Sequence, residues 1–120
     1  MFGRRNNRLI LKCSNQLCLN RRSMKSLGNP DQVGILINEH ENYLVVVSIS
    51  PNDEFQNACT IISKGIPGNG YIKCTSDFTK KLIDMSETGL RKRNILIFPG
   101  KVVNTREFQK AVLYDLNRYL

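Results

Sequence analysis

The chain has 120 residues, 41% of them hydrophobic and 23% charged, and its formal net charge at pH 7 is +8. This length suffices for one compact domain, and this balance of hydrophobic and charged residues argues against a wholly disordered chain. No apolar run approaches ~18 residues and no apolar signal segment follows Arg4, Arg5 and Arg8, so we predict a cytoplasmic protein without a membrane span.

The start of the chain predicts a tail followed by two short strands. Residues 1–8 are expected to form a mobile basic tail. The segment Leu9–Cys13 is typical of a strand, with Gln16–Leu19 as its hairpin partner. Ser14 and Asn15 are expected at the turn, because both side chains can bond the local backbone.

A helix of about two turns is predicted next, from Asn20 to Leu27. Asn20 is a typical N-cap. Gly28 can take the left-handed position that ends a helix, and Pro30 prevents any continuation.

The segment Gln32–Ile49 predicts a hydrophobic hairpin, because apolar residues alternate in both of its halves. Leu44 and Val46 make the second half apolar on its other face as well, so we expect this strand to be covered on both sides. His40 lies in the polar link and is interpreted as an exposed turn residue.

The middle of the chain predicts a short strand at Ala58–Ser63, a turn-rich loop and a second strand at Tyr71–Cys74. The loop has several glycines, but it lacks the Gly-Lys-Ser/Thr ending of a phosphate-binding loop. A helix capped by Thr75 or Ser76 should follow. Its apolar face recurs near 3.6 residues, and its members are Phe78, Leu82, Ile83 and Met85.

The remainder predicts a glycine stop at Gly89 and a strand over residues 94–98. The last segment is ambiguous, because Asn104 and Glu107 resemble a helix start whereas residues 111–114 are apolar and prone to form a strand. We predict a strand over residues 110–116, with a helix over residues 105–118 as the alternative.

Two parts of the chain repeat the order strand, helix, glycine stop, strand. A short similarity accompanies this order, since residues 11–14 (Leu-Lys-Cys-Ser) match residues 72–75 (Ile-Lys-Cys-Thr). We therefore predict an α+β, mostly β fold. In this fold residues 1–120 form a single domain with two strand-helix-hairpin pseudo-repeats, residues 9–50 and the more divergent residues 71–120.

The positive charge is concentrated at the start of the chain. Residues 1–25 carry no acidic residue and have a net charge of +7, which leaves +1 for the other residues. Such segregation indicates a surface for an anionic partner, most often nucleic acid, although a solvated basic tail is the simpler alternative. The candidate nucleic-acid-binding residues are Arg4, Arg5, Arg8, Lys12, Arg21, Arg22 and Lys25.

The sequence contains no recognisable catalytic or metal-binding constellation. The four cysteines, Cys13, Cys18, Cys59 and Cys74, do not have the spacing of a zinc site, and His40 is the single histidine. We expect reduced, buried thiols, no cofactor, no metal and no enzymatic activity.

The first ~50 residues resemble the swapped-hairpin transcription regulators of the AbrB and MazE type. The resemblance lies in the strand Leu9–Cys13, the short basic helix ending in Ser26-Leu27-Gly28 and the two hydrophobic strands up to Val47. The chain is also similar to small uncharacterised bacterial proteins with a helix that ends in Leu-Gly-Asn-Pro. One departure is that Asn20-Arg21 stands where the family helix usually begins with proline.

In that family two units interlock into one β-rich body, and basic residues on one face bind DNA. The resemblance therefore implies an AbrB-like body, built as a monomeric pseudo-dimer or as a homodimer. It also implies a regulator that binds double-stranded DNA, with Arg21 and Arg22 the best candidates for contacts to guanine. RNA binding is a closely related alternative to this hypothesis. The alternative is a protein-interaction module, such as an antitoxin or a mobile-element accessory protein, whose hydrophobic hairpin pairs with another chain.

Overall fold

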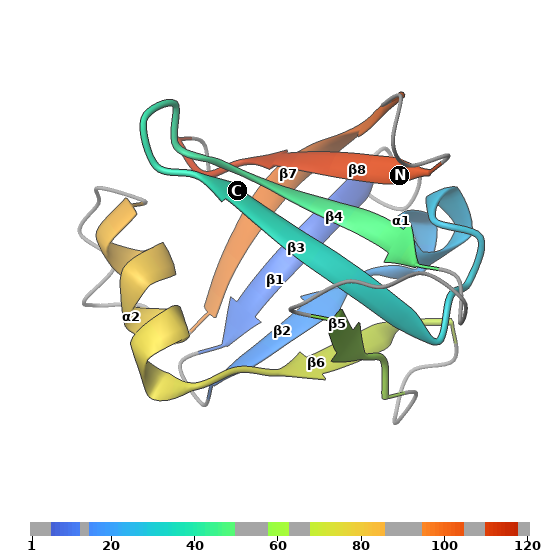
Figure 1. The fold of residues 1–120 in the computed structure, drawn as a ribbon, viewed down its shortest axis with the longest axis horizontal. Helices are drawn as coiled ribbons and strands as arrows, with labels where there is room; N and C mark the ends of the chain where they lie inside the picture. Colours follow the sequence, from blue (N-terminus) through green and yellow to red (C-terminus); the bar gives the residue numbers. More distant parts are fainter. Residues whose placement is uncertain are drawn as a thin grey trace.

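The computed structural model describes residues 6–12, 15–49, 58–62, 68–85, 95–104 and 110–117, which form eight strands and two helices (Figure 1). The elements in chain order are β1 (Asn7–Lys12), β2 (Gln16–Leu19), α1 (Arg21–Ser26), β3 (Gln32–Asn38), β4 (Tyr43–Ile49), β5 (Ala58–Thr60), β6 (Gly70–Lys73), α2 (Ser76–Met85), β7 (Ile95–Val103) and β8 (Ala111–Asp115). A mostly β fold with two helices, as predicted, is confirmed. Neither helix of the described ranges is long and apolar enough to cross a membrane.

All eight strands belong to one antiparallel sheet in the order β5-β3-β4-β8-β7-β1-β2-β6. The two outermost strands of this order approach each other, because an isolated bridge pairs Ile62, just after β5, with Tyr71 of β6. The sheet is therefore nearly closed into a barrel, which leaves few exposed edges. The curvature is visible in Figure 1, where β3 and β4 cross in front of β1 and β2.

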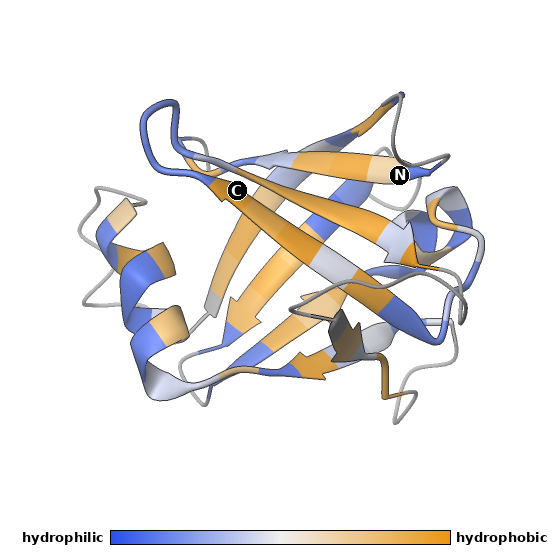
Figure 2. Ribbon diagram, in the orientation of Figure 1, coloured by the Kyte–Doolittle hydropathy of each residue, from blue (hydrophilic) through white to orange (hydrophobic). Residues whose placement is uncertain are grey.

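Alternate residues of the strands point into the sheet and form the core. In β1, Leu9 and Leu11 are fully buried, whereas the intervening residues are partly exposed, as expected for strands with one face on the core. The largest buried side chains are those of Tyr114 and Phe98, and they come from the C-terminal strands. Hydrophobic residues are concentrated in the strands of the sheet (Figure 2). Strands from both ends of the chain thus contribute to one core.

Strand β4 is buried on both faces, as the sequence predicts. Leu44 and Val46 belong to the main core. Val45 and Val47 face the other way and pack with Ala111 of β8 in a second hydrophobic cluster. The apolar character of this strand is therefore satisfied within the chain.

Helix α1 ends as its sequence predicts. Leu27 is the C-cap residue, and Gly28 takes a left-handed conformation with φ = +81°. The N–H of Gly28 donates to the carbonyl of Lys25 (3.0 Å), and the N–H of Asn29 donates to the carbonyl of Met24 (2.8 Å). These two bonds make a Schellman motif, which satisfies carbonyls that the end of the helix leaves without partners.

Helix α2 also begins as predicted. The hydroxyl of Thr75 accepts a hydrogen bond from the N–H of Phe78 (3.1 Å), so Thr75 is the cap. Leu82 and Met85 are buried, and Leu82 belongs to the main core. The predicted stop at Gly89 lies outside the described residues.

The ambiguous C-terminal segment is a strand and not a helix. Residues of β8 pair with β4 on one side and with β7 on the other, for example Val112 with Val46 and with Val102. Strand β7 is longer than expected and continues through Pro99 and Gly100 to Val103.

Strand β1 corrects the predicted extent of the basic tail. It begins at Asn7, two residues earlier than expected, so Arg8 belongs to the sheet and not to a mobile tail. Arg8 lies opposite Pro99 of β7, which fixes its place in the ladder. Residues 1–5 lie outside the described ranges.

The order strand, strand, helix, strand, strand occurs twice, first as β1-β2-α1-β3-β4 and then as β5-β6-α2-β7-β8. Each set has four strands, which can be numbered first to fourth. The pairs β2–β6 and β4–β8 join strands with the same number in the two sets, whereas β1–β7 and β3–β5 join the first strand of one set to the third strand of the other. The short sequence similarity noted above links the end of β1, the first strand of its set, to the end of β6, the second strand of the other set. That similarity therefore does not mark equivalent positions.

Candidate nucleic-acid interface

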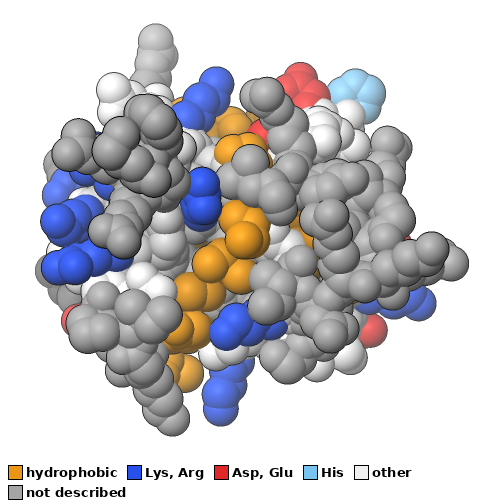
Figure 3. All heavy atoms as spheres, turned by 180° about the vertical axis from the view of Figure 1, so that it is seen from behind, with side chains coloured by type: hydrophobic (Ala, Val, Ile, Leu, Met, Phe, Trp, Pro, Cys, Tyr) orange, Lys and Arg blue, Asp and Glu red, His pale blue; other side chains and the backbone are white. Residues whose placement is uncertain are grey.

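Helix α1 presents three cations on its outer side. Arg21, Arg22 and Lys25 are exposed, whereas Ser23 and Met24 are buried against the sheet. Figure 3, seen from behind, has Lys and Arg side chains gathered at the edge of the molecule where α1 lies. A helix of fewer than two turns has little stability in water alone, so the place of these cations depends on how the helix is anchored.

Asn20 anchors the first turn of α1 to strand β1. Its Oδ1 accepts hydrogen bonds from the N–H of Ser23 and from the N–H of Arg8, both at 3.0 Å. Its Nδ2 donates to the carbonyl of Asn6 at 2.8 Å, and its own N–H donates to the carbonyl of Arg8 at 3.2 Å. The N-cap predicted from the sequence therefore also fixes the helix to the sheet.

Ser23 anchors the buried side of α1. Its hydroxyl accepts hydrogen bonds from the Tyr114 hydroxyl (2.6 Å) and the Arg8 N–H (3.1 Å), and it donates to the Arg8 carbonyl (3.3 Å). Burial raises the pKa of Tyr114 far above its usual value, and the bond to Ser23 opposes this only in part. The phenol therefore remains a hydrogen-bond donor throughout the neutral range.

A fourth cation reaches the same helix from the C-terminal part of the chain. The Nζ of Lys110 lies so close to Gly28 that a Cβ on this glycine would be 2.8 Å away. Lys110 is exposed and directly precedes β8. We call the surface of Arg21, Arg22, Lys25 and Lys110 the α1 basic face.

A second glycine leaves room for Arg21. Gly68 has φ = +88°, and a Cβ at this position would lie 2.8 Å from Cγ and 3.1 Å from Nε of Arg21. The turn before β6 therefore packs directly against the stem of this arginine. The left-handed conformation and the close approach both require glycine here.

The other predicted binding residues lie elsewhere. Arg8 is in β1 beside the start of α1 but is only partly exposed, and its Nε is buried without a hydrogen-bond partner in the described part of the chain. Lys12 lies at the opposite end of β1, with Nζ 5.6 Å from the centre of the Tyr71 ring, a cation–π geometry. Arg4 and Arg5 lie outside the described residues. The structure thus brings together Arg8, Arg21, Arg22 and Lys25 and separates Lys12 from them.

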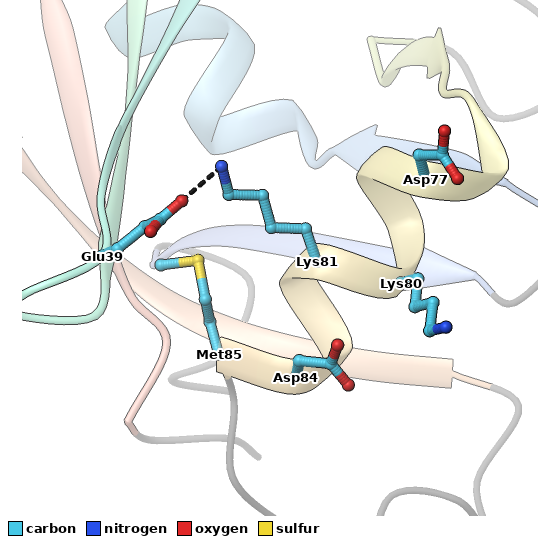
Figure 4. A pocket seen from close by; sticks show the side chains of 6 residues that line it. All are labelled: Glu39, Asp77, Lys80, Lys81, Asp84 and Met85. Atoms are coloured by element: carbon cyan, nitrogen blue, oxygen red, sulfur yellow. Dashed lines mark ion pairs between the residues drawn. The ribbon is translucent and has the colours of Figure 1, made fainter.

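Most of the described acidic side chains line two hollows that do not include the α1 basic face. Glu39, Asp77 and Asp84 line a hollow of about 380 Å³ beside α2, where Glu39 forms an ion pair with Lys81 (Figure 4). Glu41 and Asp115 line the second hollow, of about 440 Å³. Helix α2 lies at the other side of the molecule from α1 in Figure 1. Asp31, soon after α1, is the exception among the acidic residues that the structure describes.

The described residues contain no group of three or more His, Cys, Asp or Glu side chains that could hold a metal ion. No disulfide bond joins Cys18, Cys59 or Cys74, and burial raises the pKa of each thiol. Cys13 lies outside the described residues. His40 is an exposed residue of the β3–β4 turn, as predicted.

Sequence reasoning missed Lys110, its proximity to Gly28 and the contact of Gly68 with Arg21. No local signal marks Lys110, because its proximity to α1 depends on the pairing of β8 with β4. Gly68 could be recognised as a turn residue from its surroundings, but its contact with Arg21 could not.

Comparison of the chain with models of protein families, with curated proteins and with solved structures finds no match. The function is therefore argued from the α1 basic face and its surroundings.

Proposed function

We propose that the protein binds double-stranded DNA through the α1 basic face and acts as a transcriptional regulator without catalytic activity. The observation that carries the proposal is that three exposed cations of one anchored helix, Arg21, Arg22 and Lys25, lie beside a fourth, Lys110, from a distant part of the chain. Arginine and lysine side chains neutralise phosphates and release counterions, which supplies most of the affinity of such proteins for DNA. An intracellular, cytoplasmic location is part of this proposal.

The anchoring of α1 supports binding beyond simple charge attraction. Asn20 and Ser23 hold the helix to β1, and Gly68 accommodates the stem of Arg21, so this arginine is presented from a fixed backbone. A fixed arginine can donate two hydrogen bonds to O6 and N7 of a guanine in the major groove. We assign base contacts to Arg21 and Arg22, and phosphate contacts to Lys25 and Lys110.

The finer part of the fold prediction belongs to the same proposal. We infer that the two successive sets of strand, strand, helix, strand, strand are related units that interlock like the two protomers of an AbrB-type dimer. The matched pairs β2–β6 and β4–β8, and the exchanged pairs β1–β7 and β3–β5, support this inference. The second unit then begins with β5 at Ala58, and not at residue 71 as the sequence predicts.

A body completed by one chain is expected to be a monomeric pseudo-dimer. Sedimentation equilibrium should then give the mass of one chain, 13.7 kDa, without DNA. A mass of twice this value would support a homodimer and contradict the pseudo-dimer.

The alternative function, a protein-interaction module, was based on the doubly apolar strand β4. Its second face is buried against Ala111 inside the chain, which accounts for the strand without a partner. DNA is therefore the favoured partner. A second protein remains the alternative partner if DNA binding fails in the experiment below.

The test is binding to a fluorescent random-sequence duplex at salt concentrations from ~50 to ~200 mM. Four neutralised phosphates predict that the affinity falls by roughly 100-fold over this range. Single-stranded RNA of the same length serves as the competitor and is expected to displace the duplex weakly. No binding at the lowest salt would contradict the proposal. Efficient displacement of the duplex by the RNA would indicate RNA, and not DNA, as the partner.

A further inference from the structure

Among the described residues, a single bridge joins Ile62, just after β5, to Tyr71 of β6. The carbonyls and N–H groups of Ile62 and Tyr71 exchange two hydrogen bonds of 2.9 Å each. The described residues of β5 and β6 share no other ladder pair, whereas every other neighbouring pair of strands in the barrel is joined by at least three. We call this part of the sheet the seam.

Two cysteines lie three residues from this bridge, one in β5 and one directly after β6. Cys59 is three residues before Ile62, and Cys74 is three residues after Tyr71, so the register of the bridge, if continued, would set them opposite each other. The bridge is isolated, so no ladder between β5 and β6 joins the described residues beside the two cysteines. A disulfide between them would draw the two strands together here, to the ~4.4–6.8 Å Cα separation that disulfides have.

The side chains of both cysteines face the same side of the sheet. Cys59 and Cys74 are both partly buried and both pack against the main core. The charge of Cys59 contributes to the raised pKa of Cys74, which is expected only for neighbouring groups. Cys18, in contrast, alternates with the core residues Leu17 and Leu19 and faces the other side.

We propose that Cys59 and Cys74 are a modification site, at which a small-molecule disulfide of the glutathione type converts them into a cross-strand disulfide that closes the barrel. One cysteine thiolate attacks the S–S bond of the glutathione disulfide, forms a mixed disulfide and releases one glutathione thiolate. The other cysteine thiolate attacks the protein sulfur of the mixed disulfide and releases the second. The two cysteines are oxidised by two electrons, and their two protons pass to the released glutathione.

The consequence is a redox-dependent closure of the sheet at this seam. The disulfide would connect the two ends of the strand order, since β5 pairs with β3 and β6 pairs with β2. Reaction should be slow, because burial raises the pKa of both thiols and leaves little thiolate at neutral pH. The proposal concerns the state at equilibrium and is independent of DNA binding.

The experiment uses the full chain with Cys13→Ser and Cys18→Ser, which leaves only the proposed pair. The control, with Cys13→Ser and Cys59→Ser, leaves Cys18 and Cys74. Each is incubated to equilibrium with oxidised glutathione, and circular dichroism verifies that each variant is folded. Remaining thiols are blocked, and the chain is digested with trypsin without reduction. A disulfide in the first variant joins the peptide of residues 26–64 to the peptide of residues 74–80.

The first variant is expected to lose about 2 Da in intact mass, to yield the joined peptide and to unfold at a higher temperature than its reduced form. The control is expected to give glutathione adducts or unmodified thiols. Two alkylatable thiols in the first variant at equilibrium, or an equal yield of internal disulfide in the control, would overturn the proposal.

Discussion

The hydroxyl of Tyr114 donates a 2.6 Å hydrogen bond to the hydroxyl of Ser23, and 91 positions of sequence separate these two residues. Both side chains are fully buried. Ser23 in turn bonds the backbone of Arg8, so this single contact joins β8, α1 and β1. The helix that carries the basic face is thus fixed to the core by polar bonds as well as by Met24 and Leu27.

Replacing Tyr114 by phenylalanine should destabilise the protein by about 1–2 kcal/mol, because the buried Ser23 hydroxyl loses a partner that water cannot replace. Urea denaturation measures the change in the free energy of unfolding. Tyr43→Phe is the matched control, since Tyr43 is only partly buried and its hydroxyl accepts a hydrogen bond from the side chain of Asn38. A loss for Tyr114→Phe no larger than the loss for Tyr43→Phe would contradict the anchoring role.

Gly28→Ala should destabilise the protein by about 1–2 kcal/mol, since a left-handed conformation disfavours a residue with a Cβ, and the Cβ would also displace Lys110. Gly28→Asn should cost less in backbone energy because asparagine tolerates this conformation. Thermal unfolding of the two variants tests the order. A more stable alanine variant would show that the Schellman ending is not what Gly28 supplies.

Gly68→Ala should weaken DNA binding, because the new Cβ displaces Arg21. The slope of log affinity against log salt concentration should fall in magnitude by about 0.9. The effects of Gly68→Ala and Arg21→Ala on the affinity for DNA should not be additive. In a chain that already carries Arg21→Ala, the further change Gly68→Ala should leave the affinity for DNA unaltered. An equal loss in both backgrounds would show that Gly68 acts independently of Arg21.

The free energy of unfolding should fall as the pH rises above 9. Burial raises the pKa of the Cys74 thiol from 9.0 to about 11. The unfolded chain therefore loses this proton first, and the stabilisation by the neutral thiol disappears between pH 9 and about 11. Under reducing conditions, Cys74→Ser should unfold with a weaker pH dependence in this interval. If the free energy of unfolding falls equally with pH in the two proteins, Cys74 is not the group that causes the fall.

Local signals in the sequence predicted much of the fold. Asn20, Gly28 and Thr75 cap their helices as expected, because a cap depends on its own side chain and on the next few backbone groups. The alternation of apolar residues predicted the hairpin of β3 and β4, because one face of each strand packs against the main core.

Features set by distant pairing could not be predicted in the same way. Strand β7 continues past Pro99 although proline usually ends such a pattern, and β1 includes Arg8 because it pairs with β7. The candidate site was accordingly predicted in part. The three cations of α1 were recognised from their local charge, whereas Lys110 reaches α1 only through the tertiary fold.

The measurement that tests the central claim most directly compares two double variants on the same DNA duplex. Arg21→Ala/Arg22→Ala removes two cations from the α1 basic face, and Lys80→Ala/Lys81→Ala removes two exposed cations from α2. Fluorescence anisotropy from ~50 to ~200 mM salt gives the slope of log affinity against log salt. We predict that the first variant loses about 1.8 from the magnitude of this slope and that the second keeps the slope of the wild type. An equal loss in both variants would contradict the α1 basic face as the DNA-binding site.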